Sequence, residues 1–494
     1  MLRLITKQWR IVNMQNIILI ITDTFRYDNL RRRSKVMPVR TPELDAFADK
    51  RATSVEGFYT GSFPTIPHRT DIATGKLGWT AYGWQPIDLS GRNHIGRILG
   101  AKGYSTQLIC DCPHLFNARF QYGFDAAIQS RGQEGDKALL RLNIPIETVI
   151  PPEKTRMHPL YKGHSLADTH RWHNRYWQSE SETFPAKTGQ ITMQWLEENY
   201  KCGPFFLWVD FFDPHEPWDP PEYMVKRYTP DYDGIPMIHP NYGRSDAYTD
   251  AELMNLRAHY SAESELIDRW IGRVLQKIDD LQLWENSVVV VTTDHGMSIG
   301  EHARTGKSNI SDGDDRYWPI YPEIGHIPFL VSAPDIPKGN SLDIFAQPID
   351  FLPTVCELAG VDANPPDAFH GKSFANALRS GSGHHRDVIV TGCHVVAKEA
   401  SSVPGKASTP FIVTSKWGYA PVGANGTLEL YDLRIDHLAE NDIASDNEIV
   451  VKEMHDLLIE YLKEHNAPEN TIKCWGRNPR LNANGTWSID YPSE

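Results

Sequence analysis

Three side chains with metal-binding chemistry directly follow two largely apolar segments of the sequence. Asp23 comes after NIILIIT (16–22), and the pair Asp294 and His295 comes after SVVVVTT (287–293). Such runs are typical of parallel strands buried on both faces, and α/β sheets bind their ligands at the carboxyl ends of these strands. A single aspartate there more often caps a helix. Two carboxylates and an imidazole together could hold one divalent cation, namely Mn²⁺, Zn²⁺, Ca²⁺ or Mg²⁺.

The stretch SFPTIPHRTDIATG (62–75) places two hydroxyl groups and an arginine around the start of a predicted short helix. Pro67 suits the first helical turn, and Gly75 can end the helix in a left-handed conformation. Thr65 therefore precedes a helix N-terminus, whose free N–H groups stabilise negative charge, and Arg69 follows one turn later. A threonine alkoxide beside a metal would be an activated nucleophile. Locally, Ser62 remains the alternative hydroxyl, and helix capping remains the alternative role for both.

Strands and helices alternate along most of the chain and would position these groups. Further buried strands are predicted at 205–212 and 327–332, and helical periodicity marks 41–52, 94–103, 188–200 and 253–281. This alternation predicts an α/β fold with a large doubly wound mixed sheet flanked by helices. An irregular insertion at about 125–185 interrupts the pattern. Loops of that length usually cover a binding site, so we expect it over the cleft.

The chain of 494 residues is longer than a single core of about 250–300 residues, so two unequal domains are expected. Residues 1–13 are interpreted as an N-terminal extension, and residues 14–385 as the catalytic domain. After the linker-like SGSGHHRD, residues 386–494 are interpreted as a smaller α+β subdomain. It would contain a short antiparallel sheet and a terminal helix.

Charge and hydropathy exclude several classes of partner. The formal net charge of −13 argues against nucleic acid, since affinity for nucleic acids depends mainly on lysine and arginine. No segment reaches the ~18 apolar residues of a membrane span, and early charges interrupt any signal peptide. We therefore expect a cytoplasmic protein with no membrane partner and a small anionic ester as substrate. The sequence leaves open whether the chain forms a homo-oligomer.

Several motifs, in order, resemble the sulfatase family of the alkaline phosphatase superfamily. Thr65, Pro67 and Arg69, followed by Thr74-Gly75, match a C/S-x-P-x-R signature with a following TG. The segments ITDTFRYD, TPELDAFA, DPHEPW, TTDHGMSIGEH, PIDFLPTVCELAG and LYDLRIDHLAEND resemble further family landmarks. The resemblance implies an ester hydrolase. Its metal ligands would be Asp23, Thr65, Asp294 and His295, and its catalytic residues would be Thr65, Arg69, His215 and Lys307.

The departures from the family pattern shift the expected substrate. Thr65 occupies the place of the Cys or Ser that sulfatases convert to formylglycine, so no formylglycine is expected. CDCPHLF replaces the family's Lys-x-His segment and leaves His114 as a candidate substrate contact, and Asp23-Thr24 replaces the usual Asp-Asp pair. Threonine with an Asp/Asp/His metal site resembles lipoteichoic acid synthases and phosphoethanolamine transferases. We therefore expect phosphate esters, with phosphodiesters or phosphonate monoesters favoured.

The resemblance implies a double-displacement mechanism. Thr65 would attack phosphorus in line, Arg69 and Lys307 would stabilise the equatorial oxygens, and His215 would protonate the leaving alcohol. Water would then cleave the phosphothreonine. Two other functions stay open: a sulfuric ester hydrolase that works without formylglycine, and a non-catalytic homologue that binds an anion or a glycan.

Three further residues lie near these motifs in the sequence. Arg26 and Asp28 are interpreted as structural support beneath the metal site. His302, in the segment GEH, is interpreted as an outer contact of the same site.

Overall fold

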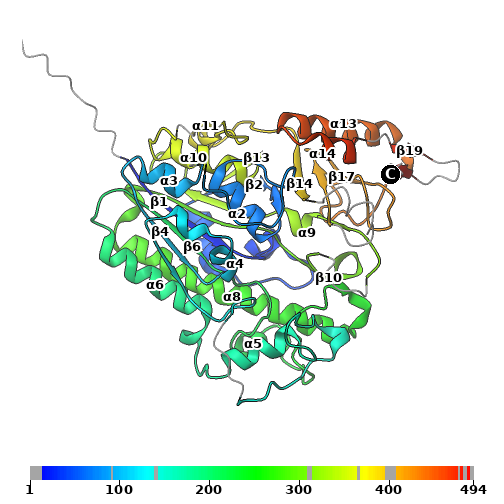
Figure 1. The fold of residues 1–494 in the computed structure, drawn as a ribbon, viewed down its shortest axis with the longest axis horizontal. Helices are drawn as coiled ribbons and strands as arrows, with labels where there is room; N and C mark the ends of the chain where they lie inside the picture. Colours follow the sequence, from blue (N-terminus) through cyan, green and yellow to red (C-terminus); the bar gives the residue numbers. More distant parts are fainter. Residues whose placement is uncertain are drawn as a thin grey trace, which may run out of the picture.

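The computed structural model describes residues 14–90, 93–137, 143–308, 314–363, 368–394 and 408–476, and the backbone of 479–481 and 487–489. Its main strands are β1 (Asn16–Thr22), β2 (Thr53–Phe58), β4 (Ser105–Cys110), β5 (Ala126–Gln129), β6 (Phe205–Asp210), β8 (Ser287–Thr293), β12 (Phe329–Ser332) and β13 (Asn340–Ala346). They form one sheet in the order β13-β2-β12-β8-β1-β6-β4-β5 (Figure 1). Strand β1 pairs in parallel with β6 and β8, and β12 is antiparallel to β8 and β2. The predicted α/β fold with a mixed sheet is confirmed.

Helices cover both faces of this sheet. Alternate side chains of β1 enter two different core clusters, so every residue of the strand is buried. One cluster contains residues of α2 (Thr65–Thr74), α3 (Ile95–Gly100), α10 (Phe351–Leu358) and α11 (Ala375–Ser380). The other contains residues of α1 (Pro42–Lys50), α6 (Phe184–Asn199) and α8 (Asp250–Asp280). Burial on both faces is the physical reason for the unbroken apolar runs in the sequence.

The predicted strands and helices correspond closely to observed elements. The segments 16–22 and 287–293 match β1 and β8, and 205–212 and 327–332 contain β6 and β12. Helix α8 begins at Asp250, earlier than its apolar periodicity indicates, because a polar capping box starts it. Thr249 Oγ1 accepts a hydrogen bond from the Glu252 N–H at 3.3 Å, and the Glu252 carboxylate accepts one from the Thr249 N–H at 2.9 Å.

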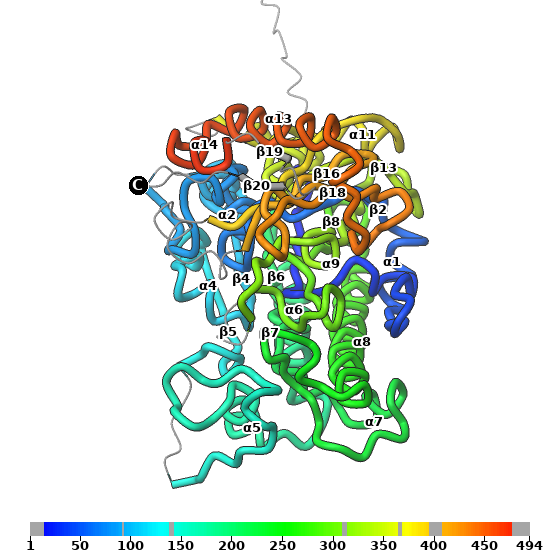
Figure 2. The backbone as a smooth tube through the Cα atoms, turned by 90° about the vertical axis from the view of Figure 1, so that its right-hand side faces the viewer, coloured from blue at the N-terminus to red at the C-terminus, as the bar shows by residue number. Residues whose placement is uncertain are grey.

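The insertion at 125–185 contains a helix that the sequence reading did not predict. Helix α5 (Leu166–Asn174) also begins at a capping box, formed by Ser165 and Asp168. Its buried residues include a threonine and a histidine, so its sequence lacks a clear apolar stripe. In Figure 2, α5 and α7 (Glu222–Val225) lie at the end of the molecule opposite α13 (Glu448–Glu464) and α14 (Glu469–Trp475).

A second sheet supports the start of α2. It contains β3 (Ser62–Phe63), β14 (Ile389–Cys393), β16 (Phe411–Val413), β17 (Trp417–Ala420) and β18 (Glu429–Asp432). The strand order is β18-β17-β16-β14-β3, in which only β3 pairs in parallel. Because β3 ends two residues before Thr65, this sheet from the C-terminal part of the chain anchors the beginning of α2.

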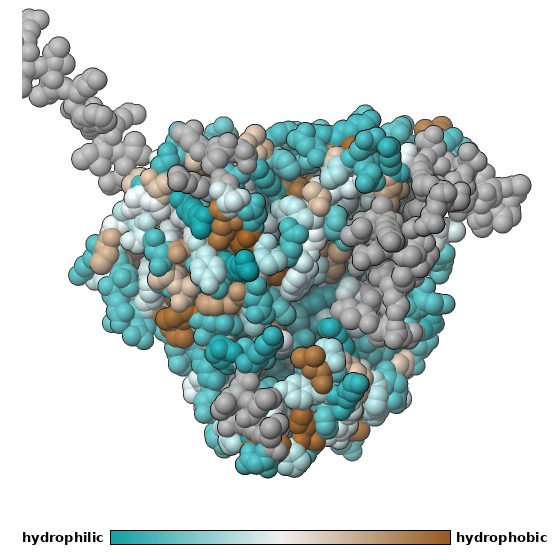
Figure 3. Space-filling view, viewed as in Figure 1, coloured by the Kyte–Doolittle hydropathy of each residue, from teal (hydrophilic) through white to brown (hydrophobic). Residues whose placement is uncertain are grey.

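The surface view shows a mainly hydrophilic face with separate apolar patches (Figure 3). Among the residues that the structure describes, no helix combines the length and the apolar composition that crossing a bilayer requires.

The Asp350–Arg386 ion pair joins the start of α10 to the segment that leads into β14. Burial alone would raise the pKa of Asp350, but the Arg386 guanidinium outweighs it and holds the pKa well below the usual range. Arg386 Nε donates to Asp350 Oδ2 at 2.7 Å. We expect Arg386→Met to destabilise the fold by about 3–5 kcal/mol in urea unfolding at pH 7, because it leaves a buried carboxylate without its cation.

Acid should weaken the same interaction. A carboxyl group with a lowered folded pKa stabilises the fold above its unfolded pKa of ~3.9, and this stabilisation is lost as the pH falls below that value. Arg434→Met is the matched control, since Arg434 pairs with Asp432 at the surface. It should change stability by no more than about 1 kcal/mol. Equal effects of both variants would contradict the prediction.

Candidate active site

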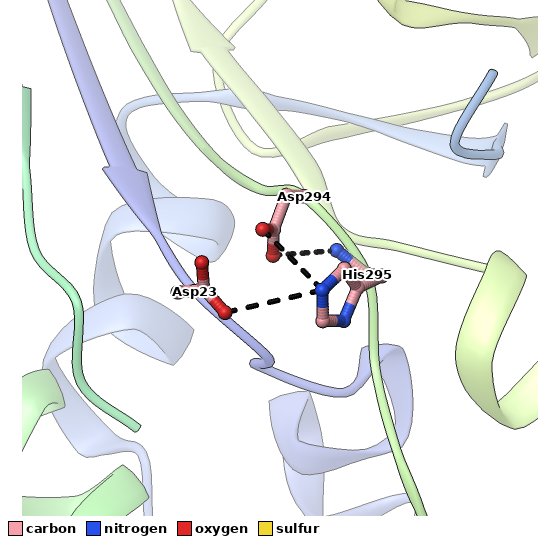
Figure 4. A group of neighbouring side chains, drawn as sticks. All are labelled: Asp23, Asp294 and His295. Atoms are coloured by element: carbon pink, nitrogen blue, oxygen red, sulfur yellow. Dashed lines mark hydrogen bonds and ion pairs between the residues drawn. The ribbon is translucent and has the colours of Figure 1, made fainter. Parts of the chain in front are cut away.

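The carboxyl ends of β1 and β8 bring Asp23, Asp294 and His295 together. The two strands are parallel neighbours, and Thr22 lies opposite Thr293, so the residues that follow them emerge side by side. All three side chains are completely buried. His295 Nε2 lies 3.5 Å from Asp294 Oδ2 and 3.9 Å from Asp23 Oδ1 (Figure 4).

This group of side chains fits a divalent cation. His295 Nδ1 donates to the Gly296 carbonyl at 2.9 Å, which leaves the Nε2 lone pair directed at the carboxylates. Burial lowers the pKa of His295 to about 3, so the ring is neutral at pH 7. Among the described residues, neither Asp23 Oδ2 nor His295 Nε2 has a hydrogen-bond partner. Buried polar atoms without partners are unfavourable, and a bound cation would satisfy them.

The Arg69 guanidinium lies among three buried carboxylates. It binds Asp210 through Nε at 3.0 Å and Nη2 at 2.9 Å, and its Nη1 lies 3.2 Å from Asp23 Oδ2 and contacts Asp294. Nη1 also donates to the Thr65 carbonyl at 3.3 Å. One guanidinium therefore faces three carboxylates, which leaves excess negative charge at the position where a cation fits.

Thr65 is the first residue of α2, whereas the sequence placed it just before the helix, and Gly75 ends the helix with φ 65°, as predicted. Its carbonyl contact with Arg69 ties it to the carboxylate group. Ser62, the alternative hydroxyl, has a structural role: its Oγ donates to Asp71 at 2.9 Å and accepts from the Gly78 and Trp79 N–H groups. These contacts favour Thr65 over Ser62 as the reactive hydroxyl.

Thr24 connects the metal-ligand candidates to Lys307. Its Oγ1 donates to Asp23 Oδ1 at 2.7 Å and accepts from Lys307 Nζ at 3.0 Å, and its N–H donates to Asp294 Oδ1 at 3.0 Å. Thr24 has φ 63°, an unusual value for a β-branched residue, and these contacts hold it there. Lys307 is only 6% exposed and thus lies in the site, not on the solvated surface.

His215 lies in the loop after β6 and stacks on Phe212, with ring centroids 4.0 Å apart. Its Nδ1 donates to the Glu216 carbonyl at 2.6 Å, so Nε2 is the nitrogen available to a substrate. Burial lowers the pKa of His215 to about 3. The ring is therefore neutral at pH 7, and it must gain a proton before it can act as an acid.

The other predicted residues lie around this centre. His114 packs edge-on against Trp84 and Phe212. Arg26 forms a bidentate pair with Asp28, at 2.8 Å for both contacts, and donates to the Met297 carbonyl at 2.9 Å, which agrees with a supporting role for both.

His302 Nε2 lies 3.6 Å from Glu323, whose carboxylate accepts a hydrogen bond from Ser298. The His302 ring stacks on Tyr321 and has its Nε2 3.0 Å from the Leu438 carbonyl, contacts that place it in a packing position next to the C-terminal part of the chain.

Sequence reasoning missed several residues of the site. Asp210 lies within the predicted strand 205–212 and is the last residue of β6, and its position after an apolar run was a usable signal. Glu134, Glu216 and His239 lie in irregular segments, where no periodicity marks them. Their proximity depends on loop packing.

Comparisons with known proteins agree with this architecture. The Sulfatase family model matches residues 15–361. An arylsulfatase of Clostridium perfringens is 24% identical over 455 residues, which cover 85% of this chain and 88% of the relative. Arylsulfatase K of Mus musculus is 21% identical, over 89% of this chain and 78% of that protein.

Solved structures with the same fold include two phosphonate monoester hydrolases. The enzyme of Agrobacterium radiobacter superposes with a TM-score of 0.69 at 20% identity, covering 97% of this chain and 100% of that one. The enzyme of Silicibacter pomeroyi gives a TM-score of 0.66 at 17% identity, covering 96% and 99% of the two chains.

Proposed function

Since the chain belongs to the sulfatase family of ester hydrolases, we propose that it cleaves phosphate esters with Thr65 as the nucleophile. Phosphodiesters or phosphonate monoesters are the favoured substrates. The observation that carries this proposal is a threonine at the first position of α2, where its carbonyl contacts the same guanidinium that binds Asp23 and Asp294.

The nucleophile depends on its surroundings for activation. The N-terminus of α2 favours negative charge on the Thr65 hydroxyl. A divalent cation held by Asp23, Asp294, His295 and Thr65 would supply the remaining stabilisation of an alkoxide. The Thr65 alkoxide attacks phosphorus in line, the bond to the leaving alcohol breaks, and protonated His215 gives that alcohol its proton. Water then attacks the phosphothreonine and gives one proton back to His215, and the bond between Thr65 and phosphorus breaks, which restores the alkoxide.

The cationic side chains have different roles in this proposal. Arg69 is completely buried and already contacts three carboxylates, which favours positioning of Thr65 and the ligand group over direct substrate contact. Lys307 lies 3.8 Å from Asp23 Oδ1 and 3.6 Å from Glu216 Oε2, and it is the better candidate to bind the substrate anion.

One chemical consideration favours phosphate over sulfate. The formylglycine hydrate of sulfatases releases sulfate by elimination, whereas a threonine ester has no second hydroxyl for that step and needs attack by water.

A sulfuric ester hydrolase without formylglycine is the second candidate, since the arylsulfatase relatives match along most of the sequence. A non-catalytic anion or glycan binder is the third. The buried ligand group, together with the hydroxyl at the nucleophile position, argues against it, because a binder needs no nucleophile.

A substrate panel separates these functions. The purified chain, with and without added Mn²⁺, Zn²⁺, Ca²⁺ or Mg²⁺, is assayed on aryl phosphodiester, phosphonate monoester, phosphomonoester and sulfate substrates. We expect metal-dependent turnover that is fastest on a diester or a phosphonate. Faster turnover of sulfate would replace the proposal with the second candidate, and no turnover on any ester would favour the binding protein.

His215→Gln tests protonation of the leaving group. We expect kcat to fall about 10²–10⁴-fold for alkyl esters, whose alkoxide needs a proton to leave. The decrease should be much smaller for nitrophenyl esters, because nitrophenolate leaves without a proton. Steady-state kinetics on both ester types measures the difference. Equal losses on both types would show that His215 does not donate a proton to the leaving group.

A further inference from the structure

A second group of metal-binding side chains lies beside the first, and among them only His215 has a part in the function proposed above. Glu134, His215 and Glu216 each offer a ligand atom, and these atoms lie within 4.8 Å of one another. His239 is adjacent, with Nε2 4.0 Å from Glu134 Oε2. Lys307 Nζ lies 3.8 Å from Asp23 Oδ1 and 3.6 Å from Glu216 Oε2, so it separates this group from the first one.

The imidazole nitrogen that faces the glutamates with a free lone pair belongs to His239, because the His215 nitrogen that faces them is Nδ1. His215 Nδ1 is 3.7 Å from both Glu134 Oε2 and Glu216 Oε2, but its proton is donated to the Glu216 carbonyl. His239 Nδ1 donates to the Pro240 carbonyl at 2.7 Å, which directs the Nε2 lone pair towards Glu134. A backbone contact of this kind commonly orients a metal-binding histidine.

Three ligand atoms of this group lack hydrogen-bond partners. Among the described residues, Glu134 Oε2, Glu216 Oε2 and His239 Nε2 are buried and make no hydrogen bond, and Glu216 and His239 are completely buried. Tyr242 donates to the other oxygen of Glu216 and so fixes that carboxylate. The same pattern of unsatisfied atoms occurs in the Asp23, Asp294 and His295 group.

The neighbouring cations do not satisfy these atoms. Lys307 Nζ stays 3.6 Å from Glu216 Oε2 and donates to Thr24 instead. Arg156 approaches the opposite oxygen of Glu134, at 3.9 Å. Neither distance is a hydrogen bond.

We propose that Glu134, Glu216 and His239 form a second divalent-cation site, next to the site of Asp23, Asp294 and His295. Ligand bonds of about 2.0–2.2 Å place the ligand atoms of one ion about 3–4.4 Å apart, and the 4.0 Å between His239 Nε2 and Glu134 Oε2 lies in that range. Two carboxylates and one imidazole suit Mn²⁺ or Zn²⁺. Because Lys307 separates the two groups, the ions would act on one substrate anion without a shared ligand.

The number of bound ions tests the proposal. Protein freed of metal with EDTA is titrated with Mn²⁺, and free Mn²⁺ is measured by electron paramagnetic resonance. We expect two ions per wild-type chain, close enough for their spins to couple, and one ion in Glu134→Gln and in His239→Gln. Asp23→Asn should also bind one ion.

Two controls complete the design. His94→Asn changes another buried histidine, keeps an acceptor for the Gly96 N–H, and should still bind two ions. Thr70→Ala removes a hydroxyl that donates to the Ile66 carbonyl and should also bind two. Saturation of the wild type at one ion would overturn the proposal, as would two ions in both Glu134→Gln and His239→Gln. The second of these outcomes would also fit a pocket that binds an ammonium group of the substrate.

Discussion

Replacing Thr65 by alanine is expected to lower kcat on phosphodiesters at least ~10³-fold, with the metal content unchanged. The change removes the only atom that can form the covalent intermediate in the proposed mechanism, whereas Asp23, Asp294 and His295 remain. Thr65→Ser keeps a hydroxyl and should retain measurable turnover. Steady-state kinetics gives kcat, and mass spectrometry of acid-quenched wild-type samples should detect a phosphoryl group on the peptide that contains Thr65.

Thr70→Ala is the matched control for this experiment. Thr70 lies in the same helix, and its hydroxyl donates to the Ile66 carbonyl at 2.8 Å. Its removal should leave kcat unchanged. Full activity of Thr65→Ala would refute the nucleophile assignment, and a phosphoryl group on another peptide would identify the residue to test next.

Asp23→Asn is expected to remove the stabilisation that a cation bound by Asp23, Asp294 and His295 provides, without lowering the stability of the metal-free protein. Wild-type protein should gain about 2.7 kcal/mol in the presence of metal at 100 times the Kd. In the variant this gain should disappear, because one of two carboxylate ligands is neutral. The metal-free Tm should stay the same or rise, since one guanidinium faces three carboxylates, Lys307 Nζ stays 3.8 Å from Asp23 Oδ1, and the substitution removes one negative charge.

Asp268→Asn is the control for loss of a buried carboxylate elsewhere. Asp268 accepts the Glu43 and Leu44 N–H groups at the start of α1, far along the chain from the ligand group. Its variant should keep the full increase in Tm on metal addition, measured by differential scanning fluorimetry. A large fall in the metal-free Tm of Asp23→Asn, with the metal response retained, would show that Asp23 is structural.

The strands were predictable because their signal is local. A strand buried on both faces is apolar at most positions, and β1 and β8 were therefore visible as runs that are followed by Asp23 and Asp294. The helix signals around Thr65 were equally local, since Pro67 and Gly75 act on their own backbone. Helix α5 was missed because polar side chains fill much of its buried face.

The preference for Thr65 over Ser62 needed distant contacts. In the sequence both hydroxyl groups lie near the start of the same helix. Only the alignment with the sulfatase motif placed Thr65, and not Ser62, at the position of the nucleophile. In the structure Ser62 makes hydrogen bonds with Asp71, Gly78 and Trp79, which explains why it has a structural role. The burial of Lys307 beside Thr24 also needed the tertiary structure. In the sequence Lys307 follows Gly306 in a loop, and nothing there indicates whether its side chain is buried.

The sequence by itself determined the fold class, the strand ends that carry Asp23 and Asp294, and the helix that begins at Thr65. Only the tertiary structure decided that Arg69 binds Asp210 as well as Asp23 and Asp294. It also decided that Glu134, Glu216 and His239 lie close together beside Lys307. The physical reason is the range of the interactions. Strand burial and helix capping involve residues that are neighbours in the chain, whereas these contacts depend on how loops from distant segments pack over the sheet.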